Sequence, residues 1–408
     1  MPGMLQGVFA RIGAGTAVPF AVVFSDGSEY RSGDAAPAWT MRFRTAAAER
    51  RTVLFGHIGL VESYLDEMLD IEGDLGSAFR AGMDATFDAT PNRLVQVRNR
   101  WHELRFSNAS RAQAKANARF HYGLSAEFYK LWLDIPAMMY TCAYWKEGTR
   151  TLEEAQANKI EHVCRKVQLA PGERVVDIGC GFGGFMFQAW ERYRTPVTGI
   201  NTTPEQVAWL GAEIERRGLG ENLSVVEADF REIPGEFDKS ISIGTLEHAG
   251  RDQLFEVVQA HARSVKPGGL GLLHFIGHIG RYETEFYIRK HVFPGGWIPS
   301  LAETIEAMER CGLEVVDVEN LRPHYALTLD AWAERFDRNW ERIEALDPKQ
   351  FTERFRRNWR TYLYSCAEMF RSPKGYTHLF QIIYSRGNVG SDYPMTRDFI
   401  YRAPPRAA

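Results

Sequence analysis

Two residues able to exchange protons, Glu247 and His274, each follow a short apolar stretch that predicts a β-strand. Glu247 comes just after residues 240–244, and His274 comes just after residues 269–273. Ligands bind beyond the carboxyl ends of the strands in parallel α/β sheets, so we expect the two side chains to emerge beside each other. An acid and an imidazole would then share one pocket, where they could take part in proton transfer. The alternative is that each side chain only caps its own strand by a hydrogen bond.

A glycine cluster follows an earlier predicted strand and opens a helix. Residues 174–184 read RVVDIGCGFGG, with Asp177 inside the end of the strand. Glycine is needed where the backbone approaches a ligand closely or takes a positive φ, and a helix N-terminus attracts a carboxylate or a phosphate. The GxGxGG spacing therefore predicts a site for a nucleotide-like ligand. The alternative is an ordinary tight turn between strand and helix.

Two further predicted strands support a cofactor site. The strand at residues 197–200 ends before Asn201 and Thr202, where a dinucleotide-binding enzyme would carry an acid for the ribose, so we expect amide and hydroxyl contacts there instead. Residues 203–206, TPEQ, predict a capping box that opens the next helix. The third strand, residues 225–229, ends in an acid suited to an adenine amine. The predicted cofactor-binding residues are Asp177, Gly179, Gly181, Gly183, Asn201, Thr202, Gln206, Asp229 and Phe230.

The elements around these residues predict an α/β protein with a Rossmann-like core. Residues 18–44 alternate short apolar runs with turn residues and predict strands, and residues 46–80 predict helix, with a stripe of Ile58, Val61, Leu65 and Leu69. Strands alternate with helices from residue 173 to 277, which is typical of a doubly wound parallel sheet. Beyond residue 277 we expect a helix capped by Ser300 and Glu303, a strand LEVVDV, two amphipathic helices that could roof an apolar pocket, and a last strand HLFQIIYS.

Residues 93–119 form the most asymmetric charge run of the chain. They carry seven Arg or Lys residues against the single acid Glu103, with Trp101 and Phe106 between them. A solvated linker helix is one interpretation, and a surface that docks on anionic lipid headgroups is the other. The candidate membrane contacts are Arg98, Arg105 and Arg111.

Composition favours a globular protein in a reducing compartment. The chain has 408 residues, a net charge of −3 and five scattered cysteines without a CxxC pair. The first residues lack the pattern of a secretory signal, and no apolar run approaches the roughly 18 residues of a membrane-spanning helix. We therefore expect a cytoplasmic protein with peripheral membrane contact only, no nucleic-acid partner and no metal site.

Several strings together resemble one enzyme family, the cyclopropane fatty acid synthases, including the mycolic acid cyclopropane synthases. The resemblance runs from about Phe120 to Asn388. The strings are FHYGLSAEFYKLWLD, YTCAYW, VVDIGCGFGG, TLEHAG, LLHFIG, HVFPGGWIPS, PHYALTLDAW, CAEMFR and FQIIYSRG. The resemblance implies a Rossmann-like class I methyltransferase with helical lid insertions (residues 151–408), a basic linker and active-site lid segment (106–150) and a small lipid-binding α+β domain (1–105).

The resemblance also implies the reaction. Family members transfer the methyl carbon of S-adenosylmethionine to a cis double bond of a phospholipid acyl chain, and a bound bicarbonate takes a proton as the ring closes. The matching catalytic positions are Cys142, Glu247, His274, Ile276 and Tyr325. Aromatic faces can stabilise a cation formed on the acyl chain, and the candidates besides Tyr325 are Tyr140, Tyr144, Trp145 and Phe275.

Three strings depart from the family pattern and leave the product open. HYDxGNxFY is HYGLSAEFY at residues 121–129, GMFEHVG is GTLEHAG at 244–250, and CAGxF is CAEMF at 366–370. The alternatives are the same methylation without ring closure, giving a methylene- or methyl-branched chain, methylation of a small molecule, and a non-enzymatic lipid-binding role. The expected partner is the inner face of the membrane with its phospholipid acyl chains, and a homodimer stays open.

Overall fold

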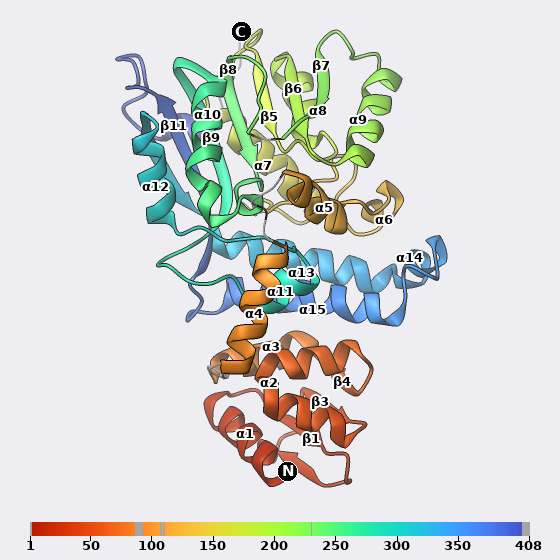
Figure 1. The fold of residues 1–408 in the computed structure, drawn as a ribbon. Coiled ribbons are helices and arrows are strands. Elements are labelled where there is room, and N and C mark those ends of the chain that lie inside the picture. The colour runs from red at the N-terminus through yellow and green to blue at the C-terminus, as the bar shows by residue number, and fades with distance from the viewer. Residues whose placement is uncertain (1, 86–92, 107, 109–110, 230, 402–408) are drawn as a thin grey trace. The chain divides into compact units, whose positions relative to one another are not determined.

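The computed structural model describes residues 2–85, 93–106, 108, 111–229 and 231–401, and Figure 1 labels their helices and strands. The chain divides into two compact units. The first contains Met1–Arg105, Phe286–Val292 and Leu329–Gly375, and the second contains Phe106–Glu285, Phe293–Thr328 and Tyr376–Ala408. The domain boundaries expected after residues 105 and 150 stay a prediction.

The first unit is built on a four-stranded sheet in the order β2-β1-β3-β4. Strands β1 and β3 are parallel, and the outer strands pair antiparallel to them. Buried and more exposed residues alternate along β3, as expected for a strand with one face on a core. The prediction of strands within residues 18–44 is confirmed. The four strands are β1 (Phe20–Val23), β2 (Glu29–Arg31), β3 (Trp39–Phe43) and β4 (Leu69–Gly73).

The continuous helix predicted for residues 46–80 is wrong. Helix α2 (Ala46–Leu65) is kinked at Gly56, and β4 separates it from α3 (Leu75–Asp84). Leu69 follows Leu65 by four residues, so the helical spacing appeared to continue, but Leu69 pairs with Phe43 on β3. Pairing with a distant strand therefore overrode the local pattern.

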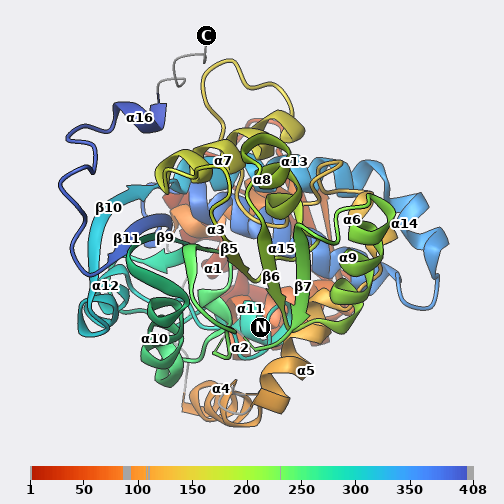
Figure 2. The same ribbon diagram turned by 90° about the horizontal axis from the view of Figure 1, so that it is seen from above.

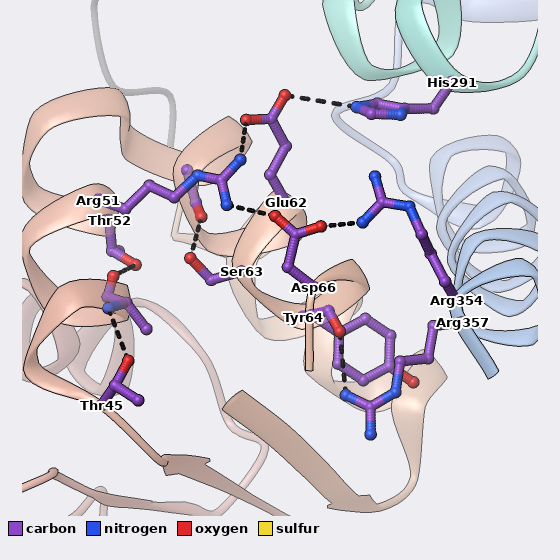
Figure 3. Close-up of polar contacts among 12 residues, drawn as sticks. Thr45, Arg51, Thr52, Glu62, Ser63, Tyr64, Asp66, His291, Arg354 and Arg357 are labelled. Carbon is purple, nitrogen blue, oxygen red and sulfur yellow. Dashed lines mark hydrogen bonds and ion pairs between the residues drawn. The ribbon is translucent and has the colours of Figure 1, made fainter. Parts of the chain in front are cut away.

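Ion pairs tie helix α15 to the end of α2 within the first unit (Figure 3). The guanidinium of Arg357 donates to the carbonyl oxygens of Tyr64 (2.9 Å) and Leu69 (3.0 Å) and to the carboxylate of Asp70 (2.8 Å). Arg354, one turn earlier, is half exposed and pairs with Asp66. The other helices of this unit are α1 (Pro2–Gly15), α4 (Arg93–Phe106), α11 (Phe286–His291), α14 (Trp340–Leu346), α15 (Glu353–Arg371) and the second half of α13 (Arg322–Arg338).

We expect Arg357→Met to lower the free energy of unfolding by about 3 kcal/mol, because it removes a buried guanidinium that donates to two carbonyl oxygens and to Asp70, and leaves Asp70 to its more exposed partner Arg44. Urea unfolding monitored by circular dichroism measures the change. Arg354→Met on the same helix is the control, since an exposed ion pair contributes about 1 kcal/mol or less. Equal losses in the two variants would contradict this role of Arg357.

The second unit contains a seven-stranded sheet in the order β10-β11-β9-β8-β5-β6-β7. The five strands from β9 to β7 are parallel, whereas β11 runs antiparallel to both of its neighbours. The predicted doubly wound sheet is therefore confirmed, with one antiparallel strand added. The strands are β5 (Val175–Ile178), β6 (Val197–Asn201), β7 (Leu223–Glu227), β8 (Phe237–Ile243), β9 (Val265–His278), β10 (Leu313–Asn320) and β11 (Thr377–Arg386).

Helices cover both faces of this sheet (Figure 2). Apolar residues of α7, α8 and α9 form the core on one face, and those of α10 and α12 form the core on the other. None of the described helices combines the length and apolar character needed to cross a membrane. The helices of this unit, besides the first half of α13, are α5 (Arg111–Tyr122), α6 (Ala126–Lys130), α7 (Leu152–Lys166), α8 (Gly184–Tyr193), α9 (Pro204–Arg216), η1 (Leu246–His248), η2 (Arg251–Gln253), α10 (Leu254–Ser264), α12 (Leu301–Arg310) and α16 (Asp398–Tyr401).

Two capping boxes were predicted, and one of them forms. Ser300 and Glu303 exchange side-chain and backbone hydrogen bonds at the start of α12. At the start of α9 no such box forms, because Asn201 accepts from the backbone N–H of Thr203 and donates to the side chain of Gln206. The two helices predicted between β10 and β11 are also corrected to three, α13, α14 and α15.

Candidate active site

A cleft opens at the carboxyl ends of β5, β6, β7 and β8 in the second unit. The space between atoms there is about 1080 Å³, including the part open to solvent, which suits a cofactor-sized ligand. The predicted cofactor residues that line it are Asp177, Gly179, Gly181, Asn201, Thr202, Gln206 and Asp229. Residues from four strand ends therefore meet at one place, as the position of ligand sites in parallel sheets predicts.

The three predicted glycines have positive φ but different surroundings. A Cβ on Gly179 would lie 2.1 Å from the hydroxyl oxygen of Thr245, and one on Gly183 would lie 2.5 Å from Leu210. A Cβ on Gly181, at φ +53°, would meet no described atom within 4 Å. A side chain at Gly181 would therefore occupy space that a ligand can use. A side chain at Gly179 or Gly183 would collide with other residues of the protein.

The polar residues at the other strand ends are partly engaged with the chain. Asn201 donates to Gln206 (2.9 Å) and to the carbonyl oxygen of Gly181 (3.2 Å), so it braces the glycine turn. Asp229 accepts two hydrogen bonds from the guanidinium of Arg231, at 2.6 and 2.7 Å. Phe230, the remaining predicted cofactor contact, lies outside the described residues.

Aromatic side chains that sequence reasoning did not assign to the cofactor form part of the cleft wall. Tyr122 and His248 both line the cleft, and their Oη and Nε2 atoms are 2.8 Å apart. Tyr140 also lines it and lies 2.9 Å from Nε2 of His121. Burial lowers the pKa of His248 to about 4, so this imidazole is neutral near pH 7. Both tyrosines lie before the glycine turn, and local sequence does not show that they reach the cleft.

A fully buried lysine, Lys159, also escaped the sequence analysis. Its ammonium donates to the hydroxyl of Thr141 (3.0 Å) and acts electrostatically on Cys142, Asp177 and Asp134. Burial raises the pKa of Asp177 to about 7, and the charge of Lys159 opposes this rise. A lysine within a helix is normally predicted to be exposed to solvent. Only the packing of α7 in the structure shows that Lys159 is buried.

Backbone hydrogen bonds connect the surroundings of Glu247 and His274, and the expectation that the two side chains share one pocket stays a prediction. The carboxylate of Glu247 accepts from the backbone N–H of Ile276 at 2.6 Å, and the N–H of Gly244, at the end of β8, donates to the carbonyl oxygen of His274 at 2.8 Å. His274 lies inside β9 rather than beyond a strand end, because pairing with β11 extends β9 to His278. The alternative was that each side chain only caps its own strand by a hydrogen bond. Glu247 does bond to the backbone of a strand, but that strand is β9, not the strand that precedes it.

Both side chains keep one polar atom without a partner. Oε2 of Glu247 and Nε2 of His274 are buried and make no hydrogen bond to any residue that the structure describes. Burial raises the pKa of Glu247 to about 7 and holds the pKa of His274 well below its ordinary value. Buried polar atoms normally have a partner, so each of these atoms is a candidate contact for a small polar ligand.

Cys142 and Tyr325 are both buried, and Thr328 contacts the segment that contains Cys142. Thr328, on the same helix as Tyr325, accepts hydrogen bonds from the N–H of Ala143 and from the indole of Trp145, both at 3.1 Å. Burial raises the pKa of the Cys142 thiol, so it is protonated at neutral pH and suits hydrogen bonding rather than nucleophilic attack. The non-helical run around Cys142 is thus fixed to α13.

The aromatic candidates for cation stabilisation occupy different environments. Tyr140 lines the cleft. Tyr144 stacks on His162 and His324, with centroids 4.2 and 4.8 Å away. Phe275 lies in the core beside Phe380, because neighbouring residues of a strand point to opposite faces and His274 occupies the other one. Its position does not favour the predicted role.

The fold and the cleft define a class I methyltransferase. The fold is similar to that of a coclaurine N-methyltransferase structure, which has a TM-score of 0.65 at 21% identity; the match covers 81% of this chain and 99% of that one. At this identity the likeness concerns the fold alone.

Comparisons with known proteins narrow the class to a family. The family model described as mycolic acid cyclopropane synthetase matches residues 109–382. A probable fatty acid methyltransferase of Pseudomonas putida is 36% identical over 353 residues, covering 83% of this chain and 86% of that protein. The cyclopropane-fatty-acyl-phospholipid synthase of Escherichia coli K12 is 32% identical over 345 residues, covering 83% and 85%.

A solved structure of mycolic acid cyclopropane synthase CmaA1, complexed with SAH and CTAB, has a TM-score of 0.61 and 32% identity, and covers 66% of this chain and 98% of that one. The chain therefore belongs to the cyclopropane synthase family of S-adenosylmethionine-dependent methyltransferases.

Proposed function

We propose that this enzyme transfers the methyl carbon of S-adenosylmethionine to a cis double bond of an unsaturated acyl chain in a phospholipid and closes a cyclopropane ring. The observation that carries the proposal is that the buried side chains of Glu247 and His274 each keep one polar atom that bonds to no described residue. Methyl transfer to an isolated alkene leaves a carbocation that must lose a proton, and ring closure removes that proton from the added carbon.

In this proposal Glu247 and His274 bind a bicarbonate ion. The carboxylate of Glu247 would accept from its hydroxyl, and His274 with the buried Cys142 and Tyr325 would surround its oxygens. Bicarbonate would supply a base small enough to reach a buried carbon. The N–H of Ile276 is already used by Glu247, so in this proposal that backbone orients the carboxylate.

The remaining residues would align the alkene and exclude water. An isolated alkene is a poor nucleophile, so it must lie in line with the sulfonium methyl group, and water must not trap the cation that forms. Tyr140 in the cleft wall and the buried Tyr325 are the aromatic faces best placed to stabilise that cation. Gly179, Gly181 and the residues after β6 would hold the cofactor.

The second candidate is the same methylation without ring closure, which would leave a methylene- or methyl-branched chain. The resemblance to a probable fatty acid methyltransferase favours it. Mass spectrometry of host lipids after expression, with fragmentation that distinguishes a ring from a methylene group, tests the proposal. A branched product without any ring would overturn the ring-closing function.

We also propose that α4, in the first unit, contacts the inner face of the membrane. Val97, Trp101 and Leu104 are 69%, 59% and 76% exposed and lie three and four residues apart, on one side of the helix. Arg105 is exposed, and its guanidinium lies 5.4 Å from the Trp101 ring. Apolar residues flanked by arginine suit a helix lying in an anionic lipid interface. The side chains of Arg98 and Arg111 lie outside the described residues.

Replacing Trp101 and Leu104 together with serine should weaken binding to phosphatidylglycerol-containing vesicles about a hundredfold, because two large apolar side chains no longer leave water on binding. Vesicle co-sedimentation measures this, and Leu346→Ser, at an exposed leucine of α14, is the control. Unchanged vesicle binding contradicts the proposal. If a dimer also dissociates in the double variant, this side of α4 is a contact between two copies of the chain.

A further inference from the structure

A chain of buried polar groups runs from His274 into the sheet. Gln381 on β11 lies directly opposite His274 on β9, and its side-chain amide is 3.0 Å from Nδ1 of the imidazole. The other end of the amide is 2.8 Å from the ammonium of Lys166. Gln381 and Lys166 are both fully buried, so water does not compete for these contacts.

The partners of Lys166 determine which way the amide points. Its ammonium has three donors and no acceptor, so the oxygen of Gln381 must face it. Glu319 keeps the ammonium in place by an ion pair at 2.5 Å and accepts from His162 at 2.7 Å. Turning the amide over would bring its NH₂ group against the ammonium and leave the oxygen toward Nδ1. The NH₂ group therefore points to His274.

We propose that Gln381, oriented by Lys166, is a positioning residue that holds His274 as the neutral tautomer with its proton on Nε2. The amide NH₂ needs an acceptor, which Nδ1 provides only when it carries no proton. The unsatisfied Nε2 of His274 is then an N–H donor aimed into the buried site. A protonated imidazole would place its Nδ1–H against the amide NH₂, so this contact also opposes protonation.

The tautomer of His274 follows from its contacts alone, whereas its role in binding bicarbonate rests on the proposed function. A donor at Nε2 complements the carboxylate of Glu247, since a bicarbonate offers both acceptor oxygens and one hydroxyl donor. The buried ammonium groups of Lys159 and Lys166 further disfavour a charged imidazole, while Glu319 favours it. His274 would thus bind and orient an anion rather than act as the base itself.

Nuclear magnetic resonance of the ligand-free protein with ¹⁵N-labelled histidine tests the tautomer. We expect His274 in the parent to show a protonated Nε2 and an unprotonated Nδ1. In Gln381→Glu, a carboxylate of nearly the same shape accepts from both Lys166 and His274, so the proton should move to Nδ1. His274→Asn identifies the signal, and Gln259→Glu, at a residue that contacts Arg263 on α10, is the control.

Lys166→Met keeps the test decisive if Gln381→Glu does not fold. Without the ammonium the amide can turn over, and we expect both tautomers of His274 to be populated. A protonated Nδ1 in the parent, or an unchanged tautomer in both variants, would overturn the proposal. Turnover in Gln381→Glu should fall about tenfold or more with unchanged affinity for S-adenosylhomocysteine. A product without a ring would contradict the proposed function but would leave the tautomer result standing.

Discussion

Glu247→Gln is expected to lower turnover about a hundredfold and to leave the affinity for S-adenosylhomocysteine unchanged. An amide in place of the carboxylate can still accept from the N–H of Ile276 through its oxygen, so the local structure should persist. The second oxygen becomes an NH₂ group, which cannot accept from the hydroxyl of a bound bicarbonate. The loss of one buried hydrogen-bond partner at a reacting site typically costs about 3 kcal/mol, which is about a hundredfold in rate.

Steady-state turnover and calorimetric titration in the same buffer check this prediction. Glu309→Gln, at an exposed position of α12, is the matched control. In carefully degassed buffer the activity of the parent should fall, and it should recover when bicarbonate is added. Cys142→Ser should show this dependence more clearly. Full turnover in Glu247→Gln without a bicarbonate response would remove Glu247 from the proton-accepting site.

The same residue gives the expected sign of the pH dependence. Burial raises the pKa of Glu247 to about 7, so the carboxyl group loses its proton as the pH rises through that value. Because the ionised form is the acceptor, turnover at a fixed bicarbonate concentration should increase over the same range. Glu247→Gln should lack this increase.

Gly181→Val should weaken binding of S-adenosylhomocysteine by at least about a hundredfold, or about 2.7 kcal/mol, while the protein stays folded. A Cβ at this position projects into the cleft without meeting a described atom, so the valine side chain would occupy ligand space. At Gly179 or Gly183 the same change would strike Thr245 or Leu210 and damage the fold instead.

Calorimetric titration measures the loss, and the melting temperature reports on folding. The φ of Gly181 is +53°, a conformation that disfavours valine by itself, so the control must share that strain. Gly218→Val provides it, because Gly218 has a φ of +67°, has no described atom near its Cβ and is not among the cleft residues. Unchanged affinity in Gly181→Val would remove the cofactor from this cleft.

Local sequence was sufficient wherever neighbouring residues decide the conformation. The glycine run after β5 needs positive φ at three positions, and the capping box at Ser300 uses two side chains three residues apart. Alternating strands and helices likewise predicted the parallel sheet. Where a distant strand competes, the local pattern misled, as with Leu69. At Thr203 the competitor is a nearby side chain, because Asn201 bonds to both groups that the cap would use.

The sequence by itself determined the type of fold and the glycine turn of the cofactor cleft, because both depend on residues close along the chain. Only the tertiary structure decided what surrounds them. Gln381 stands out as a polar residue in an apolar strand, but its partner His274 lies 107 positions away. Lys159 and Lys166 lie on α7, and nothing in the local sequence distinguishes them from exposed lysines. Their burial becomes apparent only when α7 packs in the folded protein. The sequence supplies only the identity of these titratable groups, and the contacts formed on folding determine their protonation states.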